Sequence, residues 1–208
     1  MSVKSLPFLL FVCFAIFVFT ACGPEPKVLV FSKTSGYRHA NIETGVAAIQ
    51  QLGKAEGFAV EATEDSTIFT EENLKNYAAV VFLNTSGDVL NNWQQADFQR
   101  FIEAGGGFVG IHGAAATEYE WKWYGKLVGA FFDEHPDVQE ASVTVADNSH
   151  PATKHLPAAW PGTDEWYNFK PVPPNDKVYI TGAKGNYTHS STDSSEAAIN
   201  VPKQLRWT

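Results

Sequence analysis

The residue with the clearest chemical potential is His112, which lies in the stretch GGGFVGIHGA at residues 105–114. The apolar residues before it predict a buried strand, and the small residues around it predict a tight turn with His112 at its apex. In open α/β sheets, ligands bind at the carboxyl ends of strands, and histidine transfers protons or binds metals near neutral pH. His112 is therefore a candidate general acid or base, a candidate metal ligand, or a residue that shapes the floor of a ligand site.

The same turn argues against thiol and serine chemistry. An amidase or esterase built on such an elbow would carry Cys or Ser at the apex, where this chain has His112. The chain has two cysteines, Cys13 and Cys22, and both lie in an N-terminal segment that we expect to be removed or lipid-modified. We therefore expect a mature chain without a free thiol, a disulfide or a cysteine metal site.

Two further loops follow predicted strands, SKTSGYRH at residues 32–39 and NTSGD at residues 84–88. Both combine glycine with neutral hydroxyl or amide groups, and neither has the spacing of a phosphate-binding loop. We expect them to meet His112 in one crevice and to bind a polyhydroxylated ligand such as a sugar. The candidate ligand-binding residues in these loops are Ser35, Gly36, Tyr37, Asn84 and Thr85.

A metal site is a second possibility. His39, His112 and His135 could bind a divalent ion, although no close spacing such as HxxxH supports it. No cofactor is evident from the sequence, and the role of a divalent metal stays open at this point.

Two aromatic and acidic runs also stand out, EYEWKWY at residues 118–124 and TDEWY at residues 163–167. Aromatic faces stack on sugar rings, and carboxylates act as general acids or bases. Tyr124, Trp166 and Tyr167 are therefore candidate ligand-binding residues. The alternative is that these aromatic side chains fill the core over the sheet.

The surrounding pattern predicts a doubly wound, mostly parallel α/β sheet of flavodoxin-like order. Apolar runs predict strands at residues 27–31, 58–63, 78–83 and 108–111, with helices between them at residues 41–57, 70–75 and 92–103. Thr70 is expected to cap the second helix, and Asn92 with Gln95 to form a capping box for the third. A short helix at 121–128, a strand at 141–145 at the sheet edge and a strand at 178–181 follow.

The N-terminus predicts export. Residues 1–21 have a short basic start, an apolar run and small residues before Cys22, as in a lipoprotein signal peptide. An uncleaved membrane anchor is the alternative. We expect lipidation of Cys22, a tether at residues 22–26 and a location on the bacterial cell envelope. With a net charge of −8, nucleic acid is not an expected partner.

Taken together, the motifs resemble the ThuA-like family, named for trehalose utilisation. The resemblance is carried by SKTSGYRH, by GGGFVGIHGAAATEYEWKWYGKLVGAFFDEHP, by NSHPATKHLP and by TDEWYNF, over residues 27–169. It implies a class I glutamine amidotransferase-like fold and a role in carbohydrate metabolism. It also implies that four residues fall within recurring family motifs: His39, His112, His135 and Glu165. In amidotransferases of this fold the elbow residue is cysteine, so His112 contradicts amidotransferase activity.

Family members continue past this region with a further histidine-containing segment that the last residues do not resemble. We expect a ThuA-like domain at residues 27–183 and an atypical segment at 184–208, from a truncated or frame-shifted end. The leading hypothesis is a membrane-tethered protein that binds, and processes, a sugar or oxidised sugar derivative, with His112, His39 and Glu165 as catalytic candidates. The alternatives are a non-catalytic carbohydrate-binding or scaffolding lipoprotein and a metal-dependent hydrolase.

Overall fold

The first half of the chain forms a four-stranded parallel sheet in the order β2-β1-β3-β4. The computed structural model describes residues 25–170, 178–182 and 198–200. The strands are β1 Lys27–Phe31, β2 Ala59–Thr63, β3 Ala79–Leu83 and β4 Gly107–Ile111. This is the flavodoxin-like order, in which ligands bind where the strand order reverses, between β1 and β3. The predicted fold class is confirmed.

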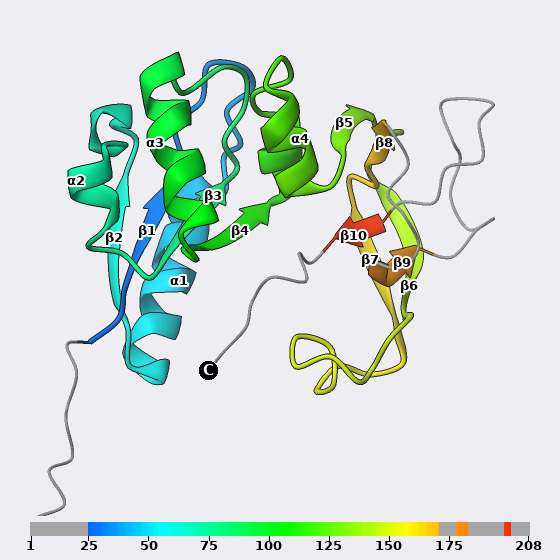
Figure 1. Cartoon of the computed structure of the whole chain (residues 1–208). Helices are drawn as coiled ribbons and strands as arrows, with labels where there is room; N and C mark the ends of the chain where they lie inside the picture. Colours follow the sequence, from blue (N-terminus) through cyan, green and yellow to red (C-terminus); the bar gives the residue numbers. More distant parts are fainter. Residues whose placement is uncertain (1–24, 171–177, 183–197, 201–208) are drawn as a thin grey trace, which may run out of the picture.

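Helices cover both faces of this sheet (Figure 1). Because side chains alternate along a strand, Val30 and Val81 face one side with Val46 of helix α1, whereas Leu29 and Phe82 face the other. The helices are α1 Ile42–Glu56 on the first face, and α2 Glu71–Leu74, α3 Asn92–Glu103 and α4 Lys122–Val128 on the second. A short 3-10 helix, η1 Ser66–Ile68, precedes α2.

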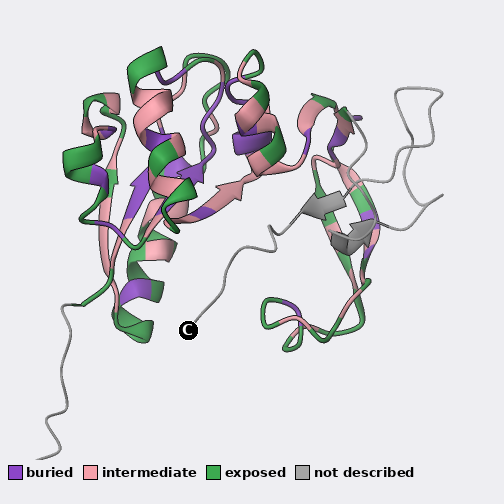
Figure 2. Ribbon diagram, viewed as in Figure 1, coloured by how far each residue is buried: buried purple, intermediate pink, exposed green. Residues whose placement is uncertain are grey.

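The larger core lies on the second face and is built around Phe82. This side chain is fully buried and packs against several other aromatic rings, the nearest being Phe98 at 5.3 Å between centroids. Figure 2 shows the buried residues concentrated in the central strands and on the inner faces of the helices. Burial of this apolar surface is the main stabilising contribution to this half of the molecule.

The helix caps agree with the sequence prediction, except that the cap of α3 lies one residue earlier than predicted. The hydroxyl of Thr70 accepts a hydrogen bond from the backbone N–H of Asn73, as predicted. The capping box of α3 is formed by Asn91 and Gln94, not by Asn92 and Gln95. Asn91 has the extended backbone that a capping residue requires, with φ −81° and ψ 169°, so the predicted box is wrong by one residue.

The second half of the chain pairs antiparallel. Strands β6 Gln139–Val145, β7 Ala159–Asp164, β9 Val178–Gly182 and β10 Ala198–Asn200 form a sheet in the order β10-β9-β6-β7. Strands β5 Phe131–Glu134 and β8 Asn168–Lys170 form a separate pair. The prediction that residues 141–145 lie at the edge of the parallel sheet is therefore wrong, because β6 has β7 on one side and β9 on the other.

We call residues 27–128 the parallel half and residues 131–170 with β9 and β10 the antiparallel half; Figure 1 shows them on opposite sides of the molecule. In the portion that the structure describes, no helix has the length and apolar character needed to span a membrane. The predicted signal peptide and Cys22 lie outside the described residues, as does most of the atypical segment 184–208.

Candidate functional site

Three loops meet at the carboxyl edge of the parallel sheet, as their places after β1, β3 and β4 predict. Bridges join Thr34 to Ser86 and Gly87 to Thr117. The carbonyl of Ser86 accepts hydrogen bonds from the backbone N–H groups of Ser35 and Gly36, at 2.7 and 3.2 Å. These contacts hold the first loop beside the second, and the second beside the segment after β4.

His112 stands at the start of a short 3-10 helix, η2 His112–Ala116, and its backbone is left-handed, with φ 49°. This conformation is uncommon for a residue with a Cβ atom, and such strain concentrates at functional sites. The next residue must be small, because a Cβ atom on Gly113 would lie 3.0 Å from the carbonyl oxygen of Thr85. The turn therefore has the elbow shape that the sequence predicts.

Asn84 positions this elbow from the end of β3. It is buried and also left-handed, with φ 51°. Its side chain donates a hydrogen bond to Oδ1 of Asn41, at 2.7 Å, and its own Oδ1 lies 3.4 Å from the backbone N–H of Gly113. Asn84 thus links the N-terminus of α1 to the residue that follows His112.

Glu118 is a second positioning residue, and no sequence pattern indicates this role. Its carboxylate is buried and accepts hydrogen bonds from the backbone N–H groups of Val89 and Leu90, both at 2.8 Å, and from Gln95. Burial raises the pKa of Glu118 above its ordinary value. The side chain ties the loop after β3 to the segment after η2.

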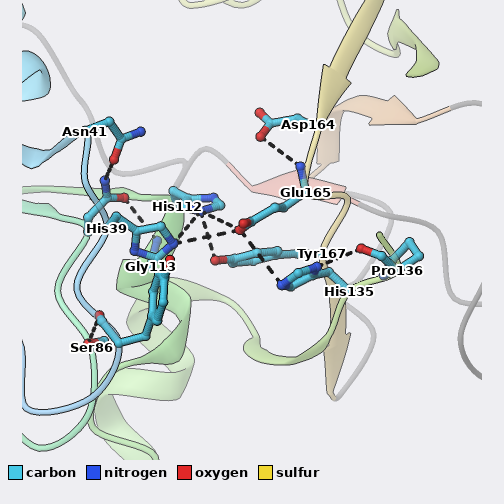
Figure 3. Close-up of polar contacts among 12 residues, drawn as sticks. His39, Asn41, Ser86, His112, Gly113, His135, Pro136, Asp164, Glu165 and Tyr167 are labelled. Atoms are coloured by element: carbon cyan, nitrogen blue, oxygen red, sulfur yellow. Dashed lines mark hydrogen bonds and ion pairs between the residues drawn. The ribbon is translucent and has the colours of Figure 1, made fainter. Parts of the chain in front are cut away.

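Polar side chains from both halves of the molecule converge on Glu165, between β7 and β8 (Figure 3). Oε2 of Glu165 lies 3.2 Å from Nε2 of His112, 3.8 Å from Nε2 of His39 and 3.9 Å from Nε2 of His135. The two nitrogens of His39 and His112 are 3.0 Å apart. The three catalytic candidates named from the sequence, His39, His112 and Glu165, are thus brought together.

Tyr167 completes the cluster. Its ring stacks on that of His112 at 4.5 Å between centroids, and its hydroxyl lies 3.0 Å from Nε2 of His112. Burial raises the pKa of Tyr167 well above its ordinary value, so its hydroxyl stays protonated and can donate. Burial also lowers the pKa of His112, and His39 lowers it further, while Glu165 and Asp164 oppose this change. His112 is therefore a neutral imidazole near pH 7.

A metal ion is compatible with part of this cluster. Among the described residues, the ligating atoms of His39, His112 and Glu165 lie within 4.8 Å of one another. His135 falls outside this group and holds its ring by a 2.7 Å contact between Nδ1 and the carbonyl of Pro136. The structure therefore gathers Glu165, in place of His135, with the two histidines that the sequence proposed as metal ligands.

The predicted ligand-binding residues of the first loop lie beside this cluster. Tyr37 is 72% exposed, and its ring meets that of His39 edge-on at 4.8 Å. Ser35 uses its hydroxyl to bond the carbonyl of Asp88, and a Cβ atom on Gly36 would lie 3.3 Å from Oγ of Ser86. Of these three, Tyr37 has the side chain that is free to contact a ligand.

Of three other residues proposed as ligand contacts, two are buried in the core. Tyr124 is fully buried and donates a hydrogen bond to the carbonyl of Ala114. Thr85 is fully buried against Thr117, and Trp166 packs on Ala141 and Val143 in the antiparallel half. We correct the interpretation of Tyr124 and Thr85, which are core residues without access to a ligand. Trp166 is partly buried next to Glu165 in the loop between β7 and β8, and its role as a ligand contact stays a prediction.

Comparison with known proteins agrees with these motifs. A family model described as ThuA, Trehalose utilisation, matches residues 27–202, which extends past the motifs quoted above. A comparison with curated proteins found no match.

The fold recurs in solved structures. A ThuA-like protein from Bacteroides uniformis ATCC 8492 is 28% identical, with a TM-score of 0.69, and the alignment covers 86% of this chain and 76% of that one. A ThuA-like protein from Parabacteroides merdae ATCC 43184 shares the fold, at 18% identity and a TM-score of 0.60, over 76% and 68% of the two chains. Given the extent of the family match, this chain belongs to the ThuA family of trehalose utilisation.

Proposed function

We propose that this protein binds a sugar or an oxidised sugar derivative and processes it at the cluster of His39, His112 and Glu165. The observation that carries the proposal is the convergence of these side chains on one point, from three separate segments of a chain whose family is described as trehalose utilisation. Perturbed, partly buried titratable groups gathered at a strand end are typical of active sites.

The cluster offers a sugar two kinds of chemistry. The neutral imidazole of His112 can take a proton from a hydroxyl or from a carbon next to a carbonyl, and Glu165, 3.2 Å away, stabilises the imidazolium that forms. The same nitrogen and oxygen atoms can instead hold an ion that binds the sugar oxygens. Both routes place the reacting part of the ligand between the two halves of the molecule.

Tyr37 supplies a surface for the sugar ring. Its exposed ring stands beside His39, and the carbonyl of the same residue accepts a 2.6 Å hydrogen bond from Ser86, which fixes the loop. Aromatic faces stack on the apolar C–H faces of sugars. We propose that the ligand lies against Tyr37 with its polar edge on Glu165.

The test is the melting temperature of the protein in the presence of trehalose, glucosides and their 3-keto forms. At a ligand concentration about 100 times its Kd, binding adds about 2.7 kcal/mol to the free energy of unfolding, a shift of several degrees. Tyr37→Ala should reduce the shift, whereas Trp93→Ala, which removes an exposed aromatic ring on α3, should not. The absence of any shift at millimolar ligand would argue against a sugar site.

The fate of the bound ligand separates an enzyme from a binding module. Product formation by the parent protein that is lost in His112→Ala, with binding of the unoxidised sugar retained, is the expected result. Binding by the parent protein without product from any ligand of the series would make the chain a non-catalytic carbohydrate-binding lipoprotein.

We also propose that the protein is exported and anchored to the cell envelope by a lipid on Cys22. The apolar run of residues 1–21, followed directly by this cysteine, supports the proposal. Cys22→Ser should move the protein from the membrane fraction to the soluble fraction. A parent protein found only in the soluble fraction would contradict the anchor.

A further inference from the structure

Three potential ligand atoms from separate segments face one another at the candidate site. Nε2 of His112 lies 3.0 Å from Nε2 of His39 and 3.2 Å from Oε2 of Glu165, and the third side of the triangle is 3.8 Å. A neutral imidazole nitrogen carries either one hydrogen or one lone pair. A hydrogen shared between the two imidazole nitrogens joins them in one hydrogen bond, and without that hydrogen all three atoms present lone pairs to one another.

We propose that these three atoms form the binding face for one divalent transition-metal ion. A triangle with these sides has a circumscribed radius of about 2.0 Å, so one ion can stand about 2.1 Å from all three atoms, which is the usual Zn–N and Zn–O distance. The lone pairs that oppose one another would then all point at a cation. The proposal rests on the same site as the proposed function and adds the ion to it.

The donor set indicates the class of ion. Two imidazole nitrogens and one carboxylate oxygen suit Zn²⁺, Fe²⁺, Co²⁺ or Ni²⁺, whereas Ca²⁺ and Mg²⁺ prefer oxygen ligands alone. Three protein ligands leave further positions for water or substrate, as in catalytic metal sites and unlike closed structural ones. The side chains remain partly exposed, 14% for His39, 24% for His112 and 27% for Glu165, so these positions face solvent.

Neighbouring groups orient each ligand before an ion arrives. The ring of Tyr167 stacks on His112, and the ring of Tyr37 meets His39 edge-on. The backbone N–H of Glu165 donates a 2.8 Å hydrogen bond to Oδ1 of Asp164, which shapes the turn that presents this carboxylate. Such supporting contacts set the direction of metal ligands and typically change metal affinity 10- to 100-fold.

A bound ion would favour one class of sugar at this site. A metal with free positions can bind two adjacent oxygens and polarise a carbonyl as a Lewis acid. The hydroxyl of Tyr167, 3.0 Å from Nε2 of His112, lies where it can donate to one of those oxygens. We therefore expect a sugar with a carbonyl next to a hydroxyl, as in a 3-keto glycoside, to bind more tightly than the unoxidised sugar when the ion is present.

The test is Co²⁺ and Zn²⁺ binding to the full chain after chelator treatment, by visible absorption and by titration calorimetry. We expect one ion per chain with a Kd of about 1 µM or lower. His39→Ala, His112→Ala and Glu165→Gln should each weaken binding by at least ~100-fold. Glu165→Gln keeps the side-chain volume and so guards against a folding defect, and circular dichroism would confirm that each variant is folded.

Two histidines provide matched controls. His155→Ala removes an exposed histidine and should leave the affinity unchanged. His135→Ala removes a third histidine, whose Nε2 lies 3.9 Å from Oε2 of Glu165, and should change the affinity by less than ~10-fold. Equal losses in His155→Ala and His112→Ala, or a Kd above a millimolar for both ions, would overturn the proposal.

Sugar binding measured with and without chelator separates the two proposals. A keto sugar that raises the melting temperature equally in chelator and in Zn²⁺, with no Co²⁺ spectrum, would overturn the metal site and leave the sugar site standing. Tight Co²⁺ binding with no shift for any sugar would overturn the proposed function and leave the metal site standing.

Discussion

The two halves of the molecule contribute to the candidate site in different ways. The parallel half holds His39 and His112 on loops that bond to one another and rest on a core of packed aromatic rings. The antiparallel half holds Glu165 and Tyr167 in the loop between β7 and β8, and its buried apolar residues, among those that the structure describes, form two small groups around Trp166. We infer that the parallel half is the more stable wall of the site and that the antiparallel half is the less stable one.

The largest effect expected from a single change is at Phe82, in the core of the parallel half. Phe82→Ala should lower the free energy of unfolding by about 3–5 kcal/mol, because it removes a fully buried ring and leaves a cavity. Urea denaturation would measure the loss. Trp93→Ala, at a ring that is 84% exposed, is the control and should change little. A loss of less than about 1 kcal/mol in the free energy of unfolding of Phe82→Ala would contradict the inference that this half is the more stable one.

A smaller and more local effect is expected at Trp166. Trp166→Ala should cost about 2 kcal/mol, because the ring is half-buried and packs on Ala141 and Val143. Hydrogen exchange should show lost protection in β6 and β7, with β1 and β3 unchanged. Equal loss of protection in all four strands would show that the two halves open as one unit, which would contradict the difference in stability that we infer between them.

Asn84 tests whether the backbone of the parallel half is strained next to the site. Asn84→Ala removes the hydrogen bond to Asn41 and leaves a Cβ atom at φ 51°, whereas Asn84→Gly removes the same bond but tolerates that backbone. We expect the alanine variant to be about 0.5–1 kcal/mol less stable than the glycine variant. Thermal unfolding of the pair would measure this difference, and an alanine variant as stable as the glycine variant would contradict backbone strain at this position.

The smallest expected effect is a pH dependence at Glu118. Burial raises the pKa of Glu118 in the folded protein above its value in the unfolded chain, so the folded protein binds this proton more tightly. The bound proton stabilises the fold below the ordinary carboxyl pKa, and this stabilisation is lost as the pH rises through the raised pKa. Relative to Glu118→Gln, the parent protein should therefore lose stability as the pH rises from about 4 to about 7. Urea midpoints of both proteins at the two pH values would show it. A difference that is constant or of opposite sign would contradict the assignment.

The same contrast marks what the sequence can predict. In the parallel half, β1, β3 and β4 are largely apolar runs between turn residues, and all four strands and their helices lie within a residue or two of their predicted bounds. In the antiparallel half, β6 was predicted at the edge of the parallel sheet. An alternating strand shows which residues share a face, but it does not show which strand will pair with it.

The residues of the candidate site also differ between the two halves in how far the sequence predicts them. His39 and His112 follow from their places after β1 and β4, which topology brings together. Glu165 came from the family resemblance, because no local pattern places a residue 53 positions after His112 beside it. Tyr124 fills the core, which is one of the two roles that the sequence leaves open, because an aromatic-rich helix looks alike in sequence whether its rings fill a core or line a site. Glu118 has a left-handed backbone, and because the residue is not glycine, the sequence does not indicate this conformation.

The most direct test of the central claim, that both halves form one site, is a double-mutant cycle on ligand affinity. His112→Ala changes the parallel half and Glu165→Gln the antiparallel half, and titration calorimetry would measure the Kd of a 3-keto glucoside for the parent, both single variants and the double variant. If both side chains act on the same ligand through one cluster, the double variant should bind no more weakly than the weaker single variant. Losses in binding free energy that simply add would contradict a shared site.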